Sequence, residues 1–301
     1  MNRDVETNDI FSTAIVDRHW SEAQHVIFDC DSTLSAIEGI DMLAKDPAQQ
    51  VEIEQLTDAA MNGECALEDV YERRLDLLKP SKADILSLAQ SYMDQIVDGA
   101  KDVVSTLLNF GIEVYVVSGG LLEPVQLFAR ALGIDASHVR AVPIVYDELC
   151  QNWWSKESTS DDQVYYRTAA SQLTQSRGKI DIIEELLEGK QGRSMLIGDG
   201  TSDLNAAQAV DSFVGFGGVV SRPAVQNQAP IFIHCASLLP ILPLALGNAR
   251  YRQLNEIDRD LHARSLSYLD DASVSFLYPY LKDKFRSCFG SCLMESQRSP
   301  Y

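Results

Sequence analysis

Two aspartates one residue apart follow a short apolar run near the start of the chain. The run is Val26-Ile27-Phe28, and Asp29 and Asp31 come after it with one cysteine between them. Side chains at positions i and i+2 of an extended chain point to the same side, so both carboxylates would face one site at a strand end. Two such carboxylates repel each other unless a proton or a metal ion lies between them. The alternative is a solvated turn in which an aspartate caps the next helix.

These residue types suit phosphoryl chemistry. A carboxylate can attack phosphorus and split a difficult hydrolysis into two steps, which makes Asp29 the candidate nucleophile. Asp31 is then the candidate acid for the leaving alkoxide and the base for water. Ser32 and Thr33 can hold phosphate oxygens or cap the following helix.

Two motifs that suit an anion lie further along the chain. Ser118-Gly119-Gly120 follows an apolar run, and its glycines would let a ligand approach N–H groups at a helix start. A plain turn with an N-cap is the alternative. Arg177 and Lys179 open a later helical pattern, where cations are locally unfavourable, so one of them is a candidate to neutralise a phosphoryl group. A surface role is the alternative for both cations.

A third motif carries two more aspartates. Asp199 and Asp203 flank a glycine-containing turn after the apolar run Met195–Ile197. With Asp29 they form an oxygen-rich set that suits Mg²⁺, which prefers octahedral oxygen ligation and retains waters. The alternative is a turn capped by aspartate side chains, which fits Asp203 better than Asp199.

The elements that must position these motifs alternate between apolar runs and amphipathic helical patterns. Such alternation predicts an α/β fold with a doubly wound parallel sheet. The predicted strands cover 25–28, 112–117, 195–197, 213–216 and 231–233. Ligands of such sheets bind outside the carboxyl ends of the strands. The motifs fall at strand ends or helix starts, which indicates one site.

Two stretches lie outside this core pattern. The periodicity of 35–97 is helical throughout, so we expect a small helical cap inserted after the first strand, between the core segments 22–34 and 98–240. Residues 241–301 predict a helical C-terminal extension, in which apolar residues from Leu254 to Leu269 suit one amphipathic helix. Residues 1–21 are expected to be a polar extension.

Composition narrows the class of protein. The 301 residues are 46% hydrophobic, as in an ordinary globular protein, and hold no apolar run of transmembrane length. A formal net charge of −19 argues against a nucleic-acid or anionic-membrane surface. Scattered cysteines and an acidic N-terminus without a long apolar stretch predict a soluble, reduced, cytoplasmic protein.

Taken in order, the motifs resemble those of the haloacid dehalogenase superfamily of aspartyl-phosphate hydrolases. The likeness is strongest to its phosphoserine phosphatase family, because the cap matches as well as the core. The matching cap residues are Glu38-Gly39-Ile40-Asp41, Ala60-Met61 near Gly63, and Arg74-Leu75 before Pro80-Ser81. The similarity covers roughly residues 22–240.

The resemblance implies a Mg²⁺-dependent phosphomonoester hydrolase with a Rossmann-like core. Asp29 would be phosphorylated, and Asp31 would act as acid and base and bind the metal through its backbone carbonyl. Asp199 would complete the metal site, with Asp203 in support.

The resemblance also implies a small phosphorylated metabolite as substrate, most closely phosphoserine. The positions that would contact it or its phosphate are Glu38, Met61, Arg74, Ser118, Gly119 and either Arg177 or Lys179. A zwitterionic amino acid needs one anion and one cation, which would be Glu38 for the ammonium and Arg74 for the carboxylate. Without the family, both read as solvated helix charges.

Departures from the family pattern keep other interpretations open. The family's phosphate-binding lysine aligns with Arg177, and a cap position that is aromatic in the family is Leu67 here. The segment 147–174 is longer than the family pattern leads us to expect, and it would form either a surface hairpin or a rim over the site. The alternatives are another small phosphomonoester, transfer of the phosphoryl group to an acceptor alcohol, or a non-catalytic interaction protein. Residues 241–301 have no counterpart in the family; we expect them to pack on the core or to form a homodimer.

Overall fold

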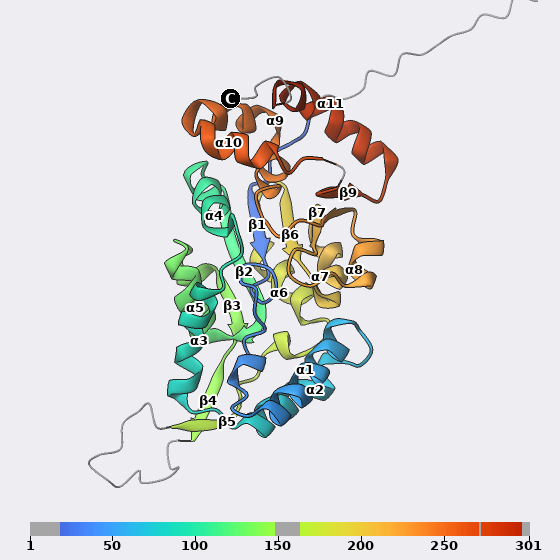
Figure 1. The fold of residues 1–301 in the computed structure, drawn as a ribbon. Coiled ribbons are helices and arrows are strands. Elements are labelled where there is room, and N and C mark those ends of the chain that lie inside the picture. Colours follow the sequence, from blue (N-terminus) through green and yellow to red (C-terminus); the bar gives the residue numbers. More distant parts are fainter. Residues whose placement is uncertain (1–18, 148–162, 271, 297–301) are drawn as a thin grey trace, which may run out of the picture.

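A seven-stranded sheet forms the centre of the computed structural model, which describes residues 19–147, 163–270 and 272–296, the last seven as backbone only. The strand order is β3-β2-β1-β6-β7-β8-β9. All neighbouring strands pair in parallel except β8 and β9. Helices pack around this sheet, and Figure 1 shows the α/β fold that the sequence predicts.

The elements that form and cover the sheet follow one another in the predicted alternation. They are β1 (His25–Phe28), α4 (Ala100–Asn109), β2 (Glu113–Leu121), α5 (Leu122–Ala131), η2 (Ala136–His138), β3 (Val139–Val142), η4 (Gln172–Thr174), α6 (Gly178–Leu187), β6 (Ser194–Gly198), α7 (Thr201–Ala206), η5 (Ala207–Ala209), β7 (Ser212–Phe216), α8 (Pro223–Gln228) and β8 (Ile231–Ile233). The edge strand β3 was missed, because its four residues stand between polar turns without a clear alternation.

Strand register brings the chemical motifs to one edge. Phe28 of β1 pairs with Val116 of β2 and with Ile197 of β6. The next residue, Asp29, donates its backbone N–H to the carbonyl of Ile197 at 2.9 Å. All four residues of β1 are buried, as expected for a parallel strand covered on both faces.

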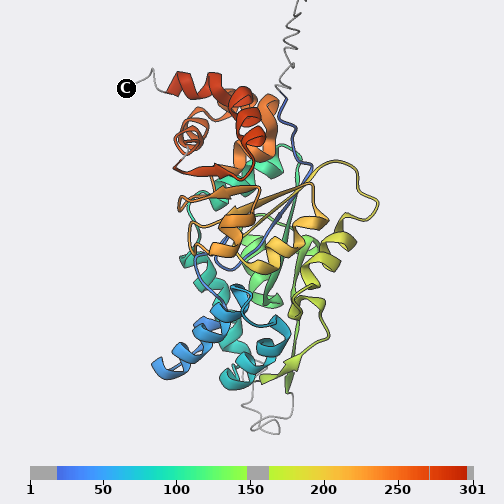
Figure 2. The ribbon, with the colours of Figure 1, turned by 90° about the vertical axis from the view of Figure 1, so that its right-hand side faces the viewer.

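Three helices lie beyond that edge, and we call them the cap. They are α1 (Pro47–Met61), α2 (Leu67–Leu78) and α3 (Lys82–Asp94), preceded by η1 (Asp41–Leu43). Ser81 and Asp84 form a capping box that starts α3, and the sequence Pro80-Ser81 also predicts that a helix starts there. Figures 1 and 2 place the cap at the end of the sheet opposite to the C-terminal helices.

The two ends of the long segment after β3 pair as a small hairpin against the cap. Strands β4 (Ile144–Asp147) and β5 (Val164–Thr168) are antiparallel. Lys82 donates its N–H to the carbonyl of Gln163 at 2.7 Å, and Tyr165 donates to Pro80 at 2.9 Å. The hairpin therefore joins α3, whereas residues 148–162 lie outside the described residues.

The C-terminal region differs from the all-helical extension that its sequence predicts. Its helices are α9 (Ile241–Ile257), α10 (Arg259–Leu266) and α11 (Pro279–Ser296), and β9 (Val274–Phe276) pairs antiparallel with β8. The prediction missed β9 because three residues are too few to show a period. The single amphipathic helix expected across 254–269 is wrong, because the chain leaves helical geometry at Asp258, whose side chain caps α10.

The predicted N-terminal boundary also shifts. Trp20, assigned to a polar extension, is buried and donates its indole N–H to the carbonyl of Leu244 at 3.0 Å. Its ring packs edge-on against Phe285 and Phe289 of α11. The C-terminal helices therefore pack on the start of the core, at the end of the sheet away from the motifs.

Candidate active site

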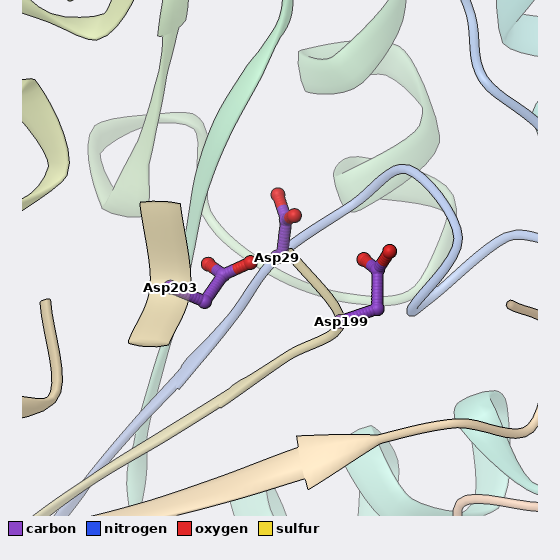
Figure 3. A group of neighbouring side chains, drawn as sticks. All are labelled: Asp29, Asp199 and Asp203. Atoms are coloured by element: carbon purple, nitrogen blue, oxygen red, sulfur yellow. The ribbon is translucent and has the colours of Figure 1, made fainter. Parts of the chain in front are cut away.

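Three aspartates from the β1 and β6 strand ends converge at the carboxyl end of the sheet. Asp29 follows β1, Asp199 follows β6, and Asp203 lies in the first turn of α7 (Figure 3). One carboxylate oxygen from each lies within 4.8 Å of the others, and all three residues are buried. Gly198 permits this approach, since a Cβ there would lie 2.2 Å from Cγ of Asp203.

Lys179 places a buried ammonium against two of these aspartates. Its Nζ lies 2.9 Å from Oδ1 of Asp29 and 2.7 Å from Oδ1 of Asp203. Burial lowers the pKa of Lys179, but Asp203 and Asp29 outweigh it and raise that pKa overall, so the ammonium keeps its proton. Arg177, the other candidate, is the residue before α6 and its side chain is exposed. The structure therefore brings Lys179, and not Arg177, to the site.

Asp31 has a different environment from Asp29. Its Oδ1 accepts from the N–H of Gly39 at 2.6 Å and from the hydroxyl of Tyr92 at 2.8 Å. Its Oδ2 accepts from the hydroxyl of Ser118 at 3.1 Å. Burial raises the pKa of Asp31, Asp29 adds to the shift, and these three donors partly offset it. A carboxyl of raised pKa beside a carboxylate suits proton transfer.

The loop after β1 is held in an unusual conformation. Ser32 has a φ of 51°, in the left-handed region that non-glycine residues rarely adopt. Its hydroxyl donates to Oε1 of Glu38 at 2.8 Å. Burial raises the pKa of Glu38, and Asp31 raises it further. Glu38 is therefore part of the same acidic cluster.

An arginine that the sequence analysis missed balances this cluster. Arg222, at the start of α8, donates from Nε to Oδ2 of Asp199 at 3.1 Å. Its Nη2 lies 3.6 Å from Oε1 of Glu38. The available signal was its position shortly after a strand end, where ligands of parallel sheets bind.

Arg74 is buried in the cap with incomplete pairing. Its Nη1 donates to the hydroxyl of Thr57 at 2.7 Å, and that hydroxyl donates to Asp41 at 2.6 Å. Its Nε is buried, and the side chain lies over the ring of Tyr71. The Tyr71 hydroxyl donates to the carbonyl of Gly119 at 2.6 Å, which links this part of the cap to the Ser118-Gly119 turn.

Space for a ligand lies beside these groups. A Cβ built on Gly119 would have no neighbour within 4 Å. A separate cleft of about 540 Å³ lies between the cap and α7; Met61, Asn62 and Thr201 are among its lining residues, whereas the acidic cluster and Lys179 are not. The sulfur of Met61 lies 3.3 Å from the position of a Cβ on Gly200, so Met61 borders the turn that carries Asp199.

The charge balance of the site fits a divalent cation. Among the described residues the acidic side chains Asp29, Asp31, Glu38, Asp199 and Asp203 face two buried cations, Lys179 and Arg222. Burial and the charge of Asp29 raise the pKa of Asp199 to about 6 and that of Asp203 to about 8. Carboxylate oxygens are ligands that Mg²⁺ prefers, and it would relieve this repulsion. The Asp31 carboxylate is outside the three-aspartate group, so its predicted metal contact through the backbone carbonyl stays a prediction.

Comparison with known proteins agrees with this arrangement. A model of the haloacid dehalogenase-like hydrolases matches residues 26–208, more than half of the chain. This chain belongs to the haloacid dehalogenase-like hydrolase family. The predicted family and fold are thereby confirmed.

Relatives within this hydrolase family are similar over most of the chain. The phosphoserine phosphatase of Mus musculus is 30% identical over 212 residues, which cover 70% of this chain and 89% of that protein. The phosphoserine phosphatase of Drosophila melanogaster is 32% identical over 217 residues, covering 70% and 75% of the two chains. The crystal structure of a phosphoserine phosphohydrolase-like protein from Francisella tularensis subsp. tularensis SCHU S4 shares 26% identity at a TM-score of 0.61, covering 70% and 95%.

Across the described ranges, none of the helices combines the length and the apolar character that crossing a membrane requires.

Proposed function

We propose that this hydrolase is a Mg²⁺-dependent phosphoserine phosphatase, which converts O-phospho-L-serine and water to L-serine and phosphate. The observation that carries the proposal is the contact between the Asp29 carboxylate and the Lys179 ammonium, beside the protonatable Asp31. Two similar relatives, from Mus musculus and Drosophila melanogaster, are phosphoserine phosphatases.

The chemistry follows from the placement of the two aspartates. Asp29 attacks phosphorus and forms an aspartyl-phosphate, while Asp31 gives its proton to the serine oxygen that leaves. Asp31 then takes a proton from water as that water attacks the phosphorus of the intermediate. Lys179 and the Ser118 turn stabilise the charge on the phosphoryl oxygens. A bound Mg²⁺, held by Asp29, Asp199 and the Asp31 carbonyl with Asp203 in support, would neutralise phosphoryl charge and orient the phosphate.

Substrate choice is assigned to the groups nearer the cap. Glu38 is the anion for the substrate ammonium, and Arg74 is the cation for its carboxylate. The buried Nε of Arg74 supports this role, because buried polar groups are normally satisfied. We also assign a substrate contact to Met61, which borders the turn that carries Asp199. We also propose that the protein is cytoplasmic. That it forms a homodimer stays a prediction.

A panel of phosphomonoesters tests the proposed function. Phosphate release is measured from phosphoserine, phosphoethanolamine, a phosphosugar and phosphoglycerate, with and without Mg²⁺, using Asp29→Asn as the blank. We expect the highest kcat/KM for phosphoserine and loss of release after chelation. Release of phosphate from the other esters but not from phosphoserine would favour a different phosphomonoester as the substrate. A transfer product with an added alcohol would favour a phosphotransferase, and no release from any ester would favour the interaction protein.

A further inference from the structure

Arg222 occupies a defined position between the sheet and the cap. It precedes Pro223, the first residue of α8, and its φ of −93° and ψ of 121° are the extended values favoured before proline. Its side chain is only 2% exposed. The local backbone therefore directs a buried guanidinium from the loop after β7 toward the site.

The contacts of this guanidinium fall into two groups. Toward the acidic cluster, Nε donates to Asp199 at 3.1 Å and Nη2 lies 3.6 Å from Glu38. On the cap side, Nη1 lies 3.4 Å from Oδ1 of Asp58 and 3.4 Å from Oδ1 of Asn62, at the end of α1. The guanidinium is planar and rigid, so a displacement on one side changes the geometry on the other.

A second attachment of the cap offers a contrast. Ser176 donates its hydroxyl to Glu68 of α2 at 2.7 Å and its N–H to the same carboxylate at 3.0 Å, at an exposed position. Neither residue touches the acidic cluster in the described contacts. Asp58 is also exposed, so the difference lies in the partner: Ser176 is not bonded to the acidic cluster, whereas Arg222 is. The Ser176 contact contributes little energy and carries no information about the state of the site.

We propose that Arg222 is a positioning residue that couples closure of the cap to the order of the Asp199 carboxylate. The inference rests on the proposed function in taking Asp199 as a Mg²⁺ ligand. Without a metal the clustered carboxylates repel one another, so Asp199 and the guanidinium bonded to it are less restrained. Mg²⁺ fixes Asp199, Asp199 fixes Arg222, and Arg222 holds the end of α1. Coupling of this kind is reciprocal, so a closed cap also favours metal binding.

Amide hydrogen exchange of the full-length protein with Mg²⁺ alone tests this coupling. Residues 57–63 report on the cap, and residues 198–206 report on the metal site. In the unmodified protein we expect Mg²⁺ to slow exchange at both, by about fivefold or more at 57–63. In Arg222→Gln, and in the double variant Asp58→Ala/Asn62→Ala, Mg²⁺ still slows 198–206 but no longer affects 57–63. Arg222→Lys provides a second test at this position if the glutamine variant does not fold.

Glu68→Gln is the matched control, because it removes the charge from a cap contact away from the site. Exchange at 57–63 should stay close to that of the unmodified protein and keep the full Mg²⁺ effect. A role of Arg222 in cap stability alone would accelerate exchange equally with and without Mg²⁺, which would overturn the inference. Absence of any Mg²⁺ effect at 198–206 in the unmodified protein would overturn the metal site itself, and with it this coupling.

Discussion

Lys179 Nζ lies 2.9 Å from Oδ1 of Asp29, and both side chains are buried at the carboxyl end of the sheet. In the proposed mechanism this ammonium would neutralise the Asp29 carboxylate before substrate binds and the phosphoryl oxygens afterwards. The sequence left Arg177 and Lys179 as alternatives, and the exposed side chain of Arg177 separates them.

Substitution of the two cations should therefore have unequal effects. Lys179→Met should lower kcat by about 100-fold or more, the scale on which a preorganised charge partner contributes to catalysis. Arg177→Met should stay within about twofold, because surface charges contribute little. Phosphate-release kinetics measure both, with circular dichroism to show that each variant is folded. Equal losses in the two variants would contradict the assignment.

Substitution of Arg74 should raise KM mainly for substrates that carry a carboxylate. Arg74→Ala removes charge-assisted hydrogen bonds, which contribute about 1.5–3 kcal/mol, so KM for phosphoserine should rise about 10- to 100-fold. For phosphoethanolamine, which has no carboxylate, the rise should be much smaller. Arg73→Ala, whose side chain is 60% exposed, is the neighbouring control. The same proportional rise in KM for both substrates would rule out the carboxylate role.

The hydroxyl of Tyr71 should matter more than a surface hydroxyl. Tyr71→Phe removes the 2.6 Å hydrogen bond to Gly119 and leaves a part-buried carbonyl without that donor. We expect a loss of about 0.5–1.5 kcal/mol of unfolding free energy, together with a lower kcat/KM because the Ser118-Gly119 turn, which we propose binds phosphate, is less restrained. Denaturant unfolding and steady-state kinetics check this, with the exposed Tyr166→Phe as control. Identical stabilities of the two variants would argue against the contact.

Asp41 should give stability a pH dependence of known sign. Burial raises its pKa from 3.8 to about 6, although Thr57 and Arg74 pull it down. The folded state thus favours the protonated carboxyl, and its contribution is complete below about pH 4 and is lost as pH rises through about 6. Asp41→Asn cannot ionise and still accepts from Thr57. Its unfolding free energy should exceed that of the parent by about 1–3 kcal/mol at pH 8, and the two should converge near pH 4.

Thermal or urea unfolding between pH 4 and pH 8 measures this difference. Glu64→Gln, at an exposed position after α1 and not among the charges that act on Asp41, is the control for removing one surface carboxylate. A parent protein that gains stability from pH 4 to pH 6 relative to Asp41→Asn would show the opposite sign and refute the assignment.

The sequence predicted the parts of the site that follow strands. Asp29, Ser118 and Asp199 each come at the end of an apolar run, and parallel pairing with matched register brings them together. Arg222 and Tyr92 escaped prediction for different reasons. Arg222 is a single cation in a polar loop, and Tyr92 reads as one more apolar residue of a cap helix, where its ring does stack on Phe128. Their roles depend on how the cap closes on the core, which periodicity does not record.

The fold shows the same division between local and long-range information. Helix starts such as Ser81 and strand ends such as Gly198 carry local signals, and the elements there agree with prediction. The strand β9 and the burial of Trp20 depend on partners more than 40 and 200 residues away along the chain. Contacts between residues so far apart along the chain are set by tertiary packing, so a short window of sequence does not predict them.

Direct detection of the phosphorylated residue tests whether Asp29 is the nucleophile. The protein is mixed with phosphoserine and Mg²⁺, quenched in acid within the first turnover, digested and analysed by mass spectrometry. We expect one added phosphoryl group on the peptide that contains Asp29. This group should be absent from the Asp29→Asn variant and from the parent protein without Mg²⁺. Turnover of phosphoserine with no phosphoryl group on that peptide, or full activity in Asp29→Asn, would contradict this role of Asp29.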